Sequence, residues 1–201
     1  MEDTMSQEKT LDKKEKVMAK FTEAAAEIIK TEGYNALTVR KVAERTEYSY
    51  PAMYHYFNDL DHLYALSKAL LIRQTVDEIL LRLHSDNVRQ DDLYGVFRIY
   101  TLYYFENPNL FRFFNDKAIP RKYLSLIYEN TPDFNSLWRT SFTKQVALGR
   151  CKVEEIDLLA KTIIYSIHGM IALALSNSGD LNEETIVDQL YSIMDYLLRK
   201  A

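Results

Sequence analysis

Apolar residues recur at helical spacing along most of this chain, and the first clear case lies near its start. They are three or four residues apart from Lys13 to Glu32 and share one helix face: Val17, Phe21, Ala25, Ile28 and Ile29. Gly33 follows, a residue suited to the left-handed conformation at a helix end. The pattern predicts a helix that ends at Glu32, and the polar residues 1–10 before it are expected to be disordered.

The same periodicity continues to the end of the chain, and no stretch alternates as a β-strand does. We therefore expect an all-α protein of about nine helices. Beyond the motif described next, the expected helices span residues 59–85, 92–107, 108–117, 120–130, 135–148, 154–176 and 182–199.

Residues 38–57 predict two short helices separated by a tight turn. The first has its apolar positions on one face and Thr38 as its N-cap, while the second begins at Ser49 and carries Pro51 in its first turn. Two helices joined in this way form a helix-turn-helix, whose second helix can enter the major groove of DNA. The outward face of that second helix holds side chains that hydrogen-bond or stack close to a duplex: Tyr50, Ala52, Tyr54, His55 and Tyr56.

This stretch resembles the N-terminal domain of TetR-type transcriptional regulators. The resemblance rests on Gly33-Tyr34, Leu37 to Arg45, Ser49, Met53-Tyr54-His55-Tyr56-Phe57 and Leu63. The family has a bulky residue, Tyr, any residue, His or Tyr, and Phe near the end of its recognition helix, and residues 53–57 match that order. Glu47 stands where the family often has Gly, and Leu60 where it usually has a Lys that helps to hold a phosphate.

The motif and the resemblance imply a double-stranded DNA operator as partner. We expect Tyr50 and His55 to read base edges or the thymine methyl group, and the other hydroxyl-bearing residues to hold phosphates. The phosphate contacts are assigned to Thr38, Ser49, Tyr54 and Tyr56, and Arg40, Lys41 and Ala52 complete the candidate DNA-binding set.

Aromatic residues are concentrated in the middle of the chain. The chain has 25 of them (15 Tyr, 9 Phe and 1 Trp), and fourteen lie in residues 94–142. An ordinary core explains most of them, yet they are too many for one helix face, and Tyr103, Phe105 and Phe113 are predicted to point away from it. TetR-like proteins carry an effector pocket in the helical body, so the resemblance implies a site for a small apolar or aromatic molecule. The candidate ligand residues are Tyr100, Tyr103, Tyr104, Phe114, Trp138, Phe142 and His168.

The last two predicted helices are long and apolar, and Gly169 lies in the middle of the first. Glycine inside a helix costs about 1 kcal/mol, which indicates a close approach of another helix, from the same chain or from a second copy. TetR-like proteins build a four-helix dimer interface from these two helices, so the resemblance implies a homodimer. The candidate interface residues are Ile163, Ile167, Gly169, Met170, Ile193 and Leu197.

Charge does not identify the partner, because the formal net charge is −4, with 25 Lys and Arg against 29 Asp and Glu. The positive charge is nevertheless clustered in a modest basic face. Its members are Lys9, Lys13, Lys14, Lys16 and Lys20 near the start, and Arg40, Lys41 and Arg45 in the motif.

The remaining features favour a cytoplasmic protein outside the membrane. The polar start lacks the apolar core of a signal peptide, Cys151 is the single cysteine, and the apolar run Ile163–Leu175 is too short to cross a bilayer. We expect a DNA-binding domain over 11–58 and a ligand-binding and dimerisation domain over 59–201.

No catalytic or cofactor motif stands out. The four histidines have no metal-ligand spacing, and no phosphate-binding or nucleophile signature is found, so we expect no metal, no cofactor and no enzyme activity. The interpretation is a ligand-responsive transcriptional regulator, a repressor released by its effector. The alternatives are a helical protein that acts through protein partners with weak DNA binding, and a small helical enzyme or lipid carrier.

Overall fold

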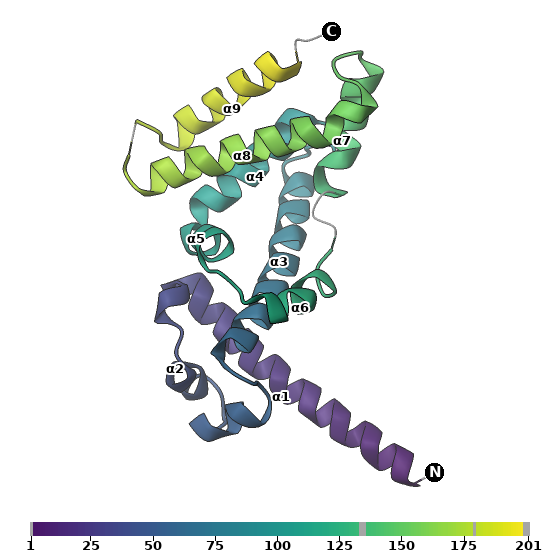
Figure 1. Ribbon diagram of the computed structural model, residues 1–201. Helices are drawn as coiled ribbons and strands as arrows, with labels where there is room; N and C mark the ends of the chain where they lie inside the picture. The colour runs from purple at the N-terminus through teal and green to yellow at the C-terminus, as the bar shows by residue number, and fades with distance from the viewer. Residues whose placement is uncertain (1, 133–135, 179, 199–201) are drawn as a thin grey trace. The chain divides into compact units, whose positions relative to one another are not determined.

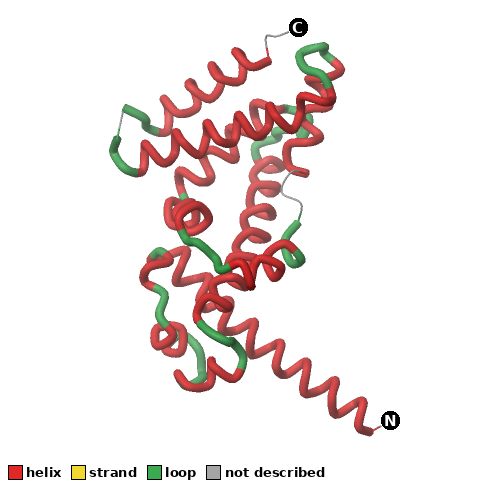
Figure 2. Tube along the Cα trace, viewed as in Figure 1, coloured by secondary structure: helices red, strands yellow, loops and turns green. Residues whose placement is uncertain are grey.

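The computed structural model describes residues 2–132, 136–178 and 180–198, and all regular structure in these ranges is helical (Figures 1 and 2). The α-helices are α1 (Glu2–Glu32), α2 (Val39–Glu44), α3 (Leu60–Ser85), α4 (Leu93–Glu106), α5 (Pro108–Asp116), α6 (Leu124–Tyr128), α7 (Ser136–Ala147), α8 (Ile156–Leu175) and α9 (Glu183–Leu198). Short 3₁₀ helices cover Tyr34–Ala36, Tyr50–His55, Arg121–Tyr123 and Val153–Glu155. The all-α prediction is confirmed, and the predicted helix ends agree with these bounds within a few residues.

The structure differs from the prediction in its first residues, because α1 begins at Glu2 where disorder was expected. The segment is polar, which suggested disorder, but it contains neither Gly nor Pro and is rich in Glu and Lys, which favour a helix. At its other end α1 stops as predicted. Gly33 has φ of 86°, and the side-chain amide of Asn109 donates to the Lys30 carbonyl at 3.1 Å.

The chain forms two compact units. The first combines residues up to Gln74 with Asn109–Pro132, and the second combines Thr75–Pro108 with the described residues after 135. The helix-turn-helix therefore packs together with the first half of α3 and with segment 109–132. The functional boundary between residues 58 and 59 stays a prediction.

The core of the first unit is built around Phe21 of α1, which is fully buried. Its ring lies 5.3 Å from that of Tyr48, 6.3 Å from Tyr56 and 5.9 Å from Phe57, measured between centroids. These three rings come from the turn and the end of the helix-turn-helix. One side chain thus fixes the motif on α1, and aromatic pairs at such distances add stability beyond their buried area.

The second unit has its core between α4 and three helices that pack on it, α7, α8 and α9. Phe97 and Phe142 are fully buried, with centroids 6.4 Å apart, and Ile163, Ile167 and Leu190 are buried as well. Within α8, Ile163 and Ile167 recur at helical spacing, as the buried face of an amphipathic helix does.

Two aromatic residues are placed differently from the prediction. Tyr103 and Phe113, expected to point away from the packed face, are buried, while Phe105 and Phe114 are only half-buried. Both buried rings pack on parts of their own unit that the helix pattern does not reveal. Tyr103 lies 3.3 Å from the Thr75 hydroxyl, and Phe113 lies 6.0 Å from the Tyr64 ring.

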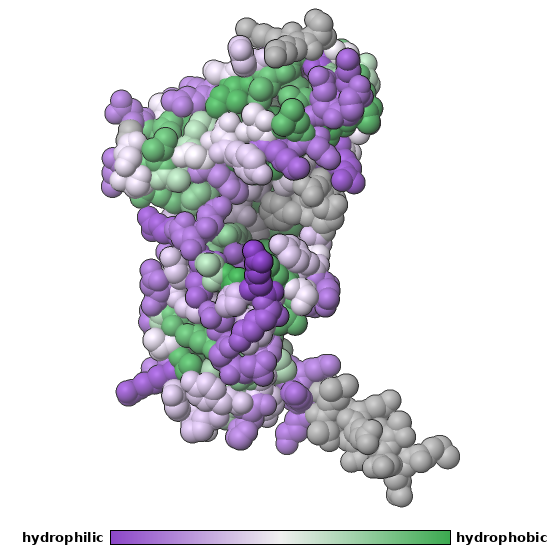
Figure 3. All heavy atoms as spheres, viewed as in Figure 1, coloured by the Kyte–Doolittle hydropathy of each residue, from purple (hydrophilic) through white to green (hydrophobic). Residues whose placement is uncertain are grey.

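Helix α8 is more extensively apolar than the thirteen-residue run seen in the sequence. With the turn before it, Val153–Leu175 is 23 residues long and apolar enough to cross a bilayer by length and composition alone, and 28% of its most apolar window is buried. The prediction of a run too short to span considered only its second half. Core helices of soluble proteins meet the same criterion, and Figure 3 shows apolar surface over α8.

Candidate nucleic-acid interface

The first helix of the motif, α2, is fixed at both ends. The Thr38 hydroxyl accepts a hydrogen bond from the Lys41 amide at 3.2 Å, which is the predicted N-cap. Val39, Val42 and Ala43 are buried against the first unit. Because the hydroxyl oxygen accepts in the cap, the Thr38 proton is still available to donate outward.

The second element of the motif is a 3₁₀ helix, Tyr50–His55, with Ser49 at its N-cap position and Pro51 in its first turn as predicted. The Ser49 side chain makes no cap hydrogen bond, so its hydroxyl has no structural task in the cap. The spacing of Met53 and Phe57 fits both helix types over such a short length, which is why the sequence did not distinguish them. Both side chains are buried and fix the outward face.

The outward face carries two exposed tyrosines, Tyr50 at 50% and Tyr54 at 52%, with rings in edge contact at 5.9 Å. The hydrogen bond that the Tyr54 hydroxyl makes with Tyr50 raises the pKa of Tyr54. His55 is exposed beside them, while Ala52 and Tyr56 are half-buried. The structure therefore presents five of the predicted DNA-binding residues on one short element.

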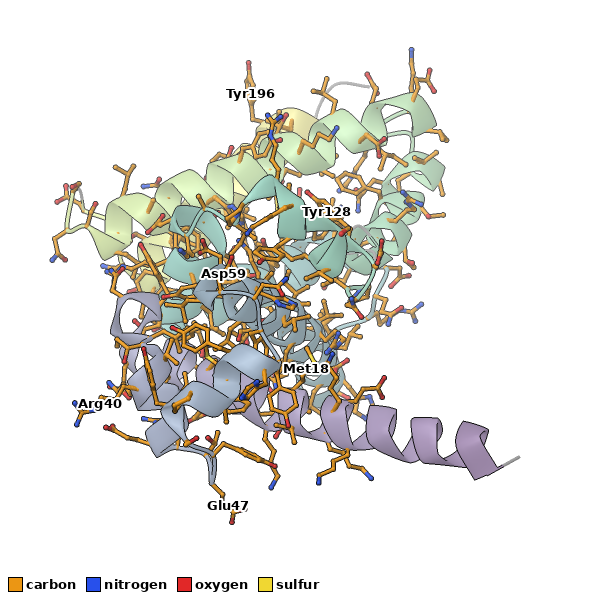
Figure 4. All side chains as sticks on the ribbon, turned by 60° about the horizontal axis from the view of Figure 1, so that its bottom comes forward. Met18, Arg40, Glu47, Asp59, Tyr128 and Tyr196 are labelled. Atoms are coloured by element: carbon orange, nitrogen blue, oxygen red, sulfur yellow. The ribbon has the colours of Figure 1, made fainter. Side chains whose placement is uncertain are left out.

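The basic residues of α2 divide into two kinds. Arg40 is exposed and pairs with Glu44 of its own helix at 3.1 Å, and Figure 4 shows it projecting from the motif. Lys41 and Arg45 both bind the Glu32 carboxylate at the end of α1, the latter at 2.6 Å. The hydrogen bond from Lys41 lowers the Glu32 pKa. The Arg40 pair lies within one exposed helix, whereas Lys41 and Arg45 connect α2 to α1.

The junction between the motif and α3 has a connection that the sequence analysis missed. Asp59 precedes α3 and accepts from the His62 amide at 2.8 Å, as an N-cap does, and also from Lys122 at 2.8 Å and the Tyr123 hydroxyl at 2.9 Å. The His62 ring stacks on Tyr123 at 5.1 Å. Lys122 thus brings a cation to the start of α3, next to Leu60, where a lysine was expected from the resemblance. No local signal links residues so far apart in the chain.

The Asp59 cluster predicts a pH dependence of stability. The hydrogen bond from Lys122 is the main cause that lowers the Asp59 pKa to about 2. A lowered pKa stabilises the folded state above the unfolded value near 3.9, and this contribution is lost as pH falls toward about 2. Asp59→Asn keeps a cap acceptor without the charge, so we expect it to lower stability by about 0.5–1 kcal/mol at pH 7, discounted for solvent exposure.

Thermal unfolding at pH 7 and at pH 2.5 measures this contribution. The difference in melting temperature between wild type and Asp59→Asn should be smaller at pH 2.5 than at pH 7. The matched control is Asp77→Asn, at an exposed aspartate of α3. A gap of constant size at both pH values would show that Asp59 acts only as a cap.

Most of the predicted ligand residues meet in the second unit. Tyr100, Tyr104 and Trp138 are buried and in edge contact, with Tyr100 5.0 Å from Tyr104 and 6.2 Å from Trp138. His168 stacks on Tyr100, and its Nε2 lies 2.8 Å from the Tyr100 hydroxyl. Burial lowers the His168 pKa, so its ring is neutral at pH 7. Phe142 joins the cluster through Phe97, and Tyr103 through Tyr104 at 5.5 Å.

Phe114 does not belong to this group, because it lies in the first unit, with its ring 5.9 Å from that of Phe113. Two features near the cluster escaped the sequence analysis. Gln145 of α7 is buried, and its side-chain oxygen has no hydrogen-bond partner among the described residues. A cleft of about 150 Å³ opens beside Trp138 and is lined further by Arg139, Ile156, Asp157, Ala160, Lys161 and Ile164.

The predicted interface residues are split between the inside and the outside of the second unit. Ile163, Ile167 and Met170 are buried within the chain, whereas Ile193 and Leu197 are half-buried and Gly169 is exposed. A side chain added at Gly169 would meet open space. The large apolar side chains that α8 and α9 do expose were not in the predicted set: Leu158, Tyr165, Leu173 and Tyr196. Among the described residues, no group of three metal-ligating side chains is found.

Comparisons with known proteins agree with this geometry. The model of the family described as bacterial regulatory proteins, tetR family, matches residues 21–65, which run from the core residue Phe21 into α3. A crystal structure of a TetR transcriptional regulator from Rhodococcus sp. RHA1 shares the fold, with a TM-score of 0.54, 15% identity, and coverage of 90% of this chain and 95% of that one. No curated protein matches the sequence. Residues 21–65 are thus identified as a DNA-binding domain of the tetR type, and the described chain has the fold of a TetR regulator.

Proposed function

We propose that this protein is a cytoplasmic transcriptional repressor that binds a palindromic operator as a homodimer and is released by a small apolar or aromatic effector. The observation that carries the proposal is the face of the Tyr50–His55 helix. Met53 and Phe57 are buried in the core of the first unit and hold this helix in place. Tyr50, Tyr54 and His55 are exposed on its opposite side. A gel shift with DNA that flanks the protein's own gene tests it, and failure to retard that DNA or random duplex would reject it.

Within this proposal, the exposed side chains divide by task. Tyr50 is more outward than Tyr56, whose ring packs on Phe21, so Tyr50 has the freedom to reach into the groove. Thr38 and Ser49 stand at the starts of the two helices of the motif with hydroxyl protons to donate. Contacts from such positions set register on the backbone, and contacts to base edges set sequence choice.

Substitutions at two tyrosines should separate base reading from phosphate binding. Tyr50→Ala should change the preferred site, because a lost base contact is worth about 1–3 kcal/mol of discrimination. Tyr56→Phe should weaken operator and random DNA alike, by about 1.5–3 kcal/mol, since a hydrogen bond to a charged phosphate is lost. Affinities for both duplexes at one salt concentration provide the measurement.

The matched control for Tyr56→Phe is Tyr128→Phe, which removes an exposed hydroxyl from α6 (Figure 4). It should bind DNA as the wild type does. Equal losses on operator and random DNA with both Tyr50→Ala and Tyr56→Phe would contradict the division of tasks.

The homodimer is supported by the surface of α8. Leu158, Tyr165 and Leu173 are exposed at spacings of seven and eight residues, which places them along one side of the helix together with Gly169. A side-chain carbon placed at Gly169 would meet nothing within 4 Å among the described residues, so they do not supply the close approach that Gly169 indicates. A second copy across a two-fold axis would cover this side with an identical one.

The effector site is proposed at the cluster of Tyr100, Tyr104, Trp138 and His168. Aromatic walls with a few hydrogen-bonding groups are typical of sites for small apolar molecules. The neutral His168 and the Tyr100 hydroxyl are such groups, and the buried Gln145 oxygen, on the same face of α7 as Trp138, is a further acceptor. The cleft beside Trp138 gives solvent a route to this tryptophan.

A further inference from the structure

Helix α1 carries a row of lysines that starts at the turn of the helix-turn-helix and continues toward the N-terminus. Lys13, Lys16 and Lys20 are spaced by three and four residues and share one side of the helix, and all three are exposed. Residues 13–20 hold four lysines against a single glutamate, whereas the whole chain is net negative. The row is therefore a local concentration of positive charge.

Residues 13–16 of α1 lie outside the core. All four are exposed, and Val17 is the first buried residue among the side chains that the structure describes in this helix. Figure 1 shows α1 (purple) continuing as a helix beyond the elements of the first unit that pack on its second half. Like charges one helical turn apart repel and weaken a helix, so this clustering of lysines carries a cost for α1.

The row begins beside the recognition helix. The Lys20 ammonium lies 5.8 Å from the centre of the Tyr48 ring and 3.7 Å from the Glu47 carboxylate. Both residues belong to the turn that leads into the Tyr50–His55 helix. From this turn the row continues outward for seven residues to Lys13, about 10 Å at 1.5 Å per residue.

We infer that this row, Lys13, Lys16 and Lys20, is a second DNA-binding surface, which contacts backbone phosphates next to the bases that the recognition helix reads. The inference rests on the proposed DNA binding. A duplex carries one negative charge about every 1.7 Å of its axis, so a row 10 Å long faces several phosphates. The contacts add affinity without sequence preference, because phosphates are the same at every base pair.

The test is the salt dependence of DNA binding by the full-length protein carrying Lys13→Gln and Lys16→Gln. Lys20 is left intact because it also touches the turn, and Gln favours a helix as well as Lys does. If each lysine holds one phosphate, the slope of log affinity against log salt should become shallower by about 1.8 for each helix-turn-helix bound to DNA. Affinity at 0.1 M salt should fall by roughly tenfold for each contact, equally for operator and random duplex.

The matched control is Lys144→Gln with Lys152→Gln, two exposed lysines of the second unit, which should keep the wild-type slope. An unchanged slope in the α1 variant, with the wild type binding normally, would overturn the inference and leave the proposed function intact. A loss on the operator alone would also overturn it, because phosphate contacts cannot select sequence. Wild-type binding to phosphatidylserine vesicles, lost in the variant while its DNA slope is unchanged, would assign the row to a membrane surface instead. A wild type that binds no duplex would reject the proposed function itself.

Discussion

Leu158→Asp should convert the protein from a dimer to a monomer at micromolar concentration. The Leu158 side chain is 70% exposed on α8, so an aspartate there costs the isolated chain little. In a two-fold interface the change occurs twice, and each carboxylate would be buried without a partner. At about 1–3 kcal/mol or more for each, the dissociation constant should rise by a factor of roughly 30 to more than 10⁴.

Light scattering measures the dimer directly, and Leu81→Asp is the matched control. Leu81 lies on α3, is 60% exposed and receives the same substitution, so it should leave the dimer intact. Leu158→Asp should also lower operator affinity, since a monomer reads only one half-site. A wild type that scatters as a monomer would remove the dimer and the palindromic operator together.

Gly169→Leu tests the same proposed interface, because it should stabilise the isolated chain and weaken its association. A leucine in the middle of α8 should stabilise the isolated chain by about 0.8 kcal/mol, because glycine is a poor helix former and open space awaits the side chain. Overpacking a close helix contact costs about 1–3 kcal/mol, so association should weaken at the same time. A variant that is more stable and equally dimeric would show that Gly169 lies outside the interface.

The interface also shows how far the sequence pattern could reach. Ile163, Ile167 and Met170 fit the apolar periodicity of α8 best, and that face packs within its own chain. Leu158 and Tyr165 are apolar too, but periodicity does not say which apolar face meets a second copy. When a helix has apolar residues on more than one side, the sequence does not show which side packs within the chain. The three-dimensional packing of the helix shows which apolar side stays exposed.

The DNA-binding face was predictable for a different reason. Tyr50, Tyr54 and His55 are close in sequence, so a local helical pattern with a buried Met53 is enough to place them outward. The Asp59–Lys122 pair joins residues 63 positions apart. The sequence around neither residue indicates this contact. Local periodicity predicts elements and their faces, whereas contacts between distant segments depend on how those elements pack.

The effector proposal leads to the second large effect. An apolar aromatic compound that binds the Tyr100 cluster should quench the fluorescence of Trp138, the single tryptophan, and lower operator affinity about 5- to 150-fold, the usual range of coupling between sites. The two effects should have the same midpoint. Compounds that quench Trp138 at saturation yet leave the DNA complex intact would show that the cluster binds ligands without controlling DNA binding.

If the effector site is the Tyr100 cluster, we expect Tyr103 to connect it to α3. Tyr103 stands between the cluster and that helix: its ring is 5.5 Å from Tyr104, its hydroxyl is 3.3 Å from the Thr75 hydroxyl, and the Arg82 guanidinium lies 5.1 Å from its ring centre. Helix α3 continues from these residues back to the Asp59 cap beside the recognition helix. A ligand that displaces Tyr104 therefore changes the contacts of a helix that both parts of the chain share.

Tyr103→Phe should weaken this coupling while leaving ligand binding intact. It removes the hydroxyl that meets Thr75 but keeps the ring against Tyr104, so quenching of Trp138 should persist with an unchanged midpoint. The drop in operator affinity on adding ligand should shrink by roughly threefold to tenfold, the value of one buried hydrogen bond. Tyr94→Phe is the matched control, since it removes a hydroxyl of α4 that donates to Asp195 of α9 at 2.6 Å. If Tyr94→Phe reduces the coupling as much as Tyr103→Phe, the signal passes through α9 and the dimer face, and the route through α3 is wrong.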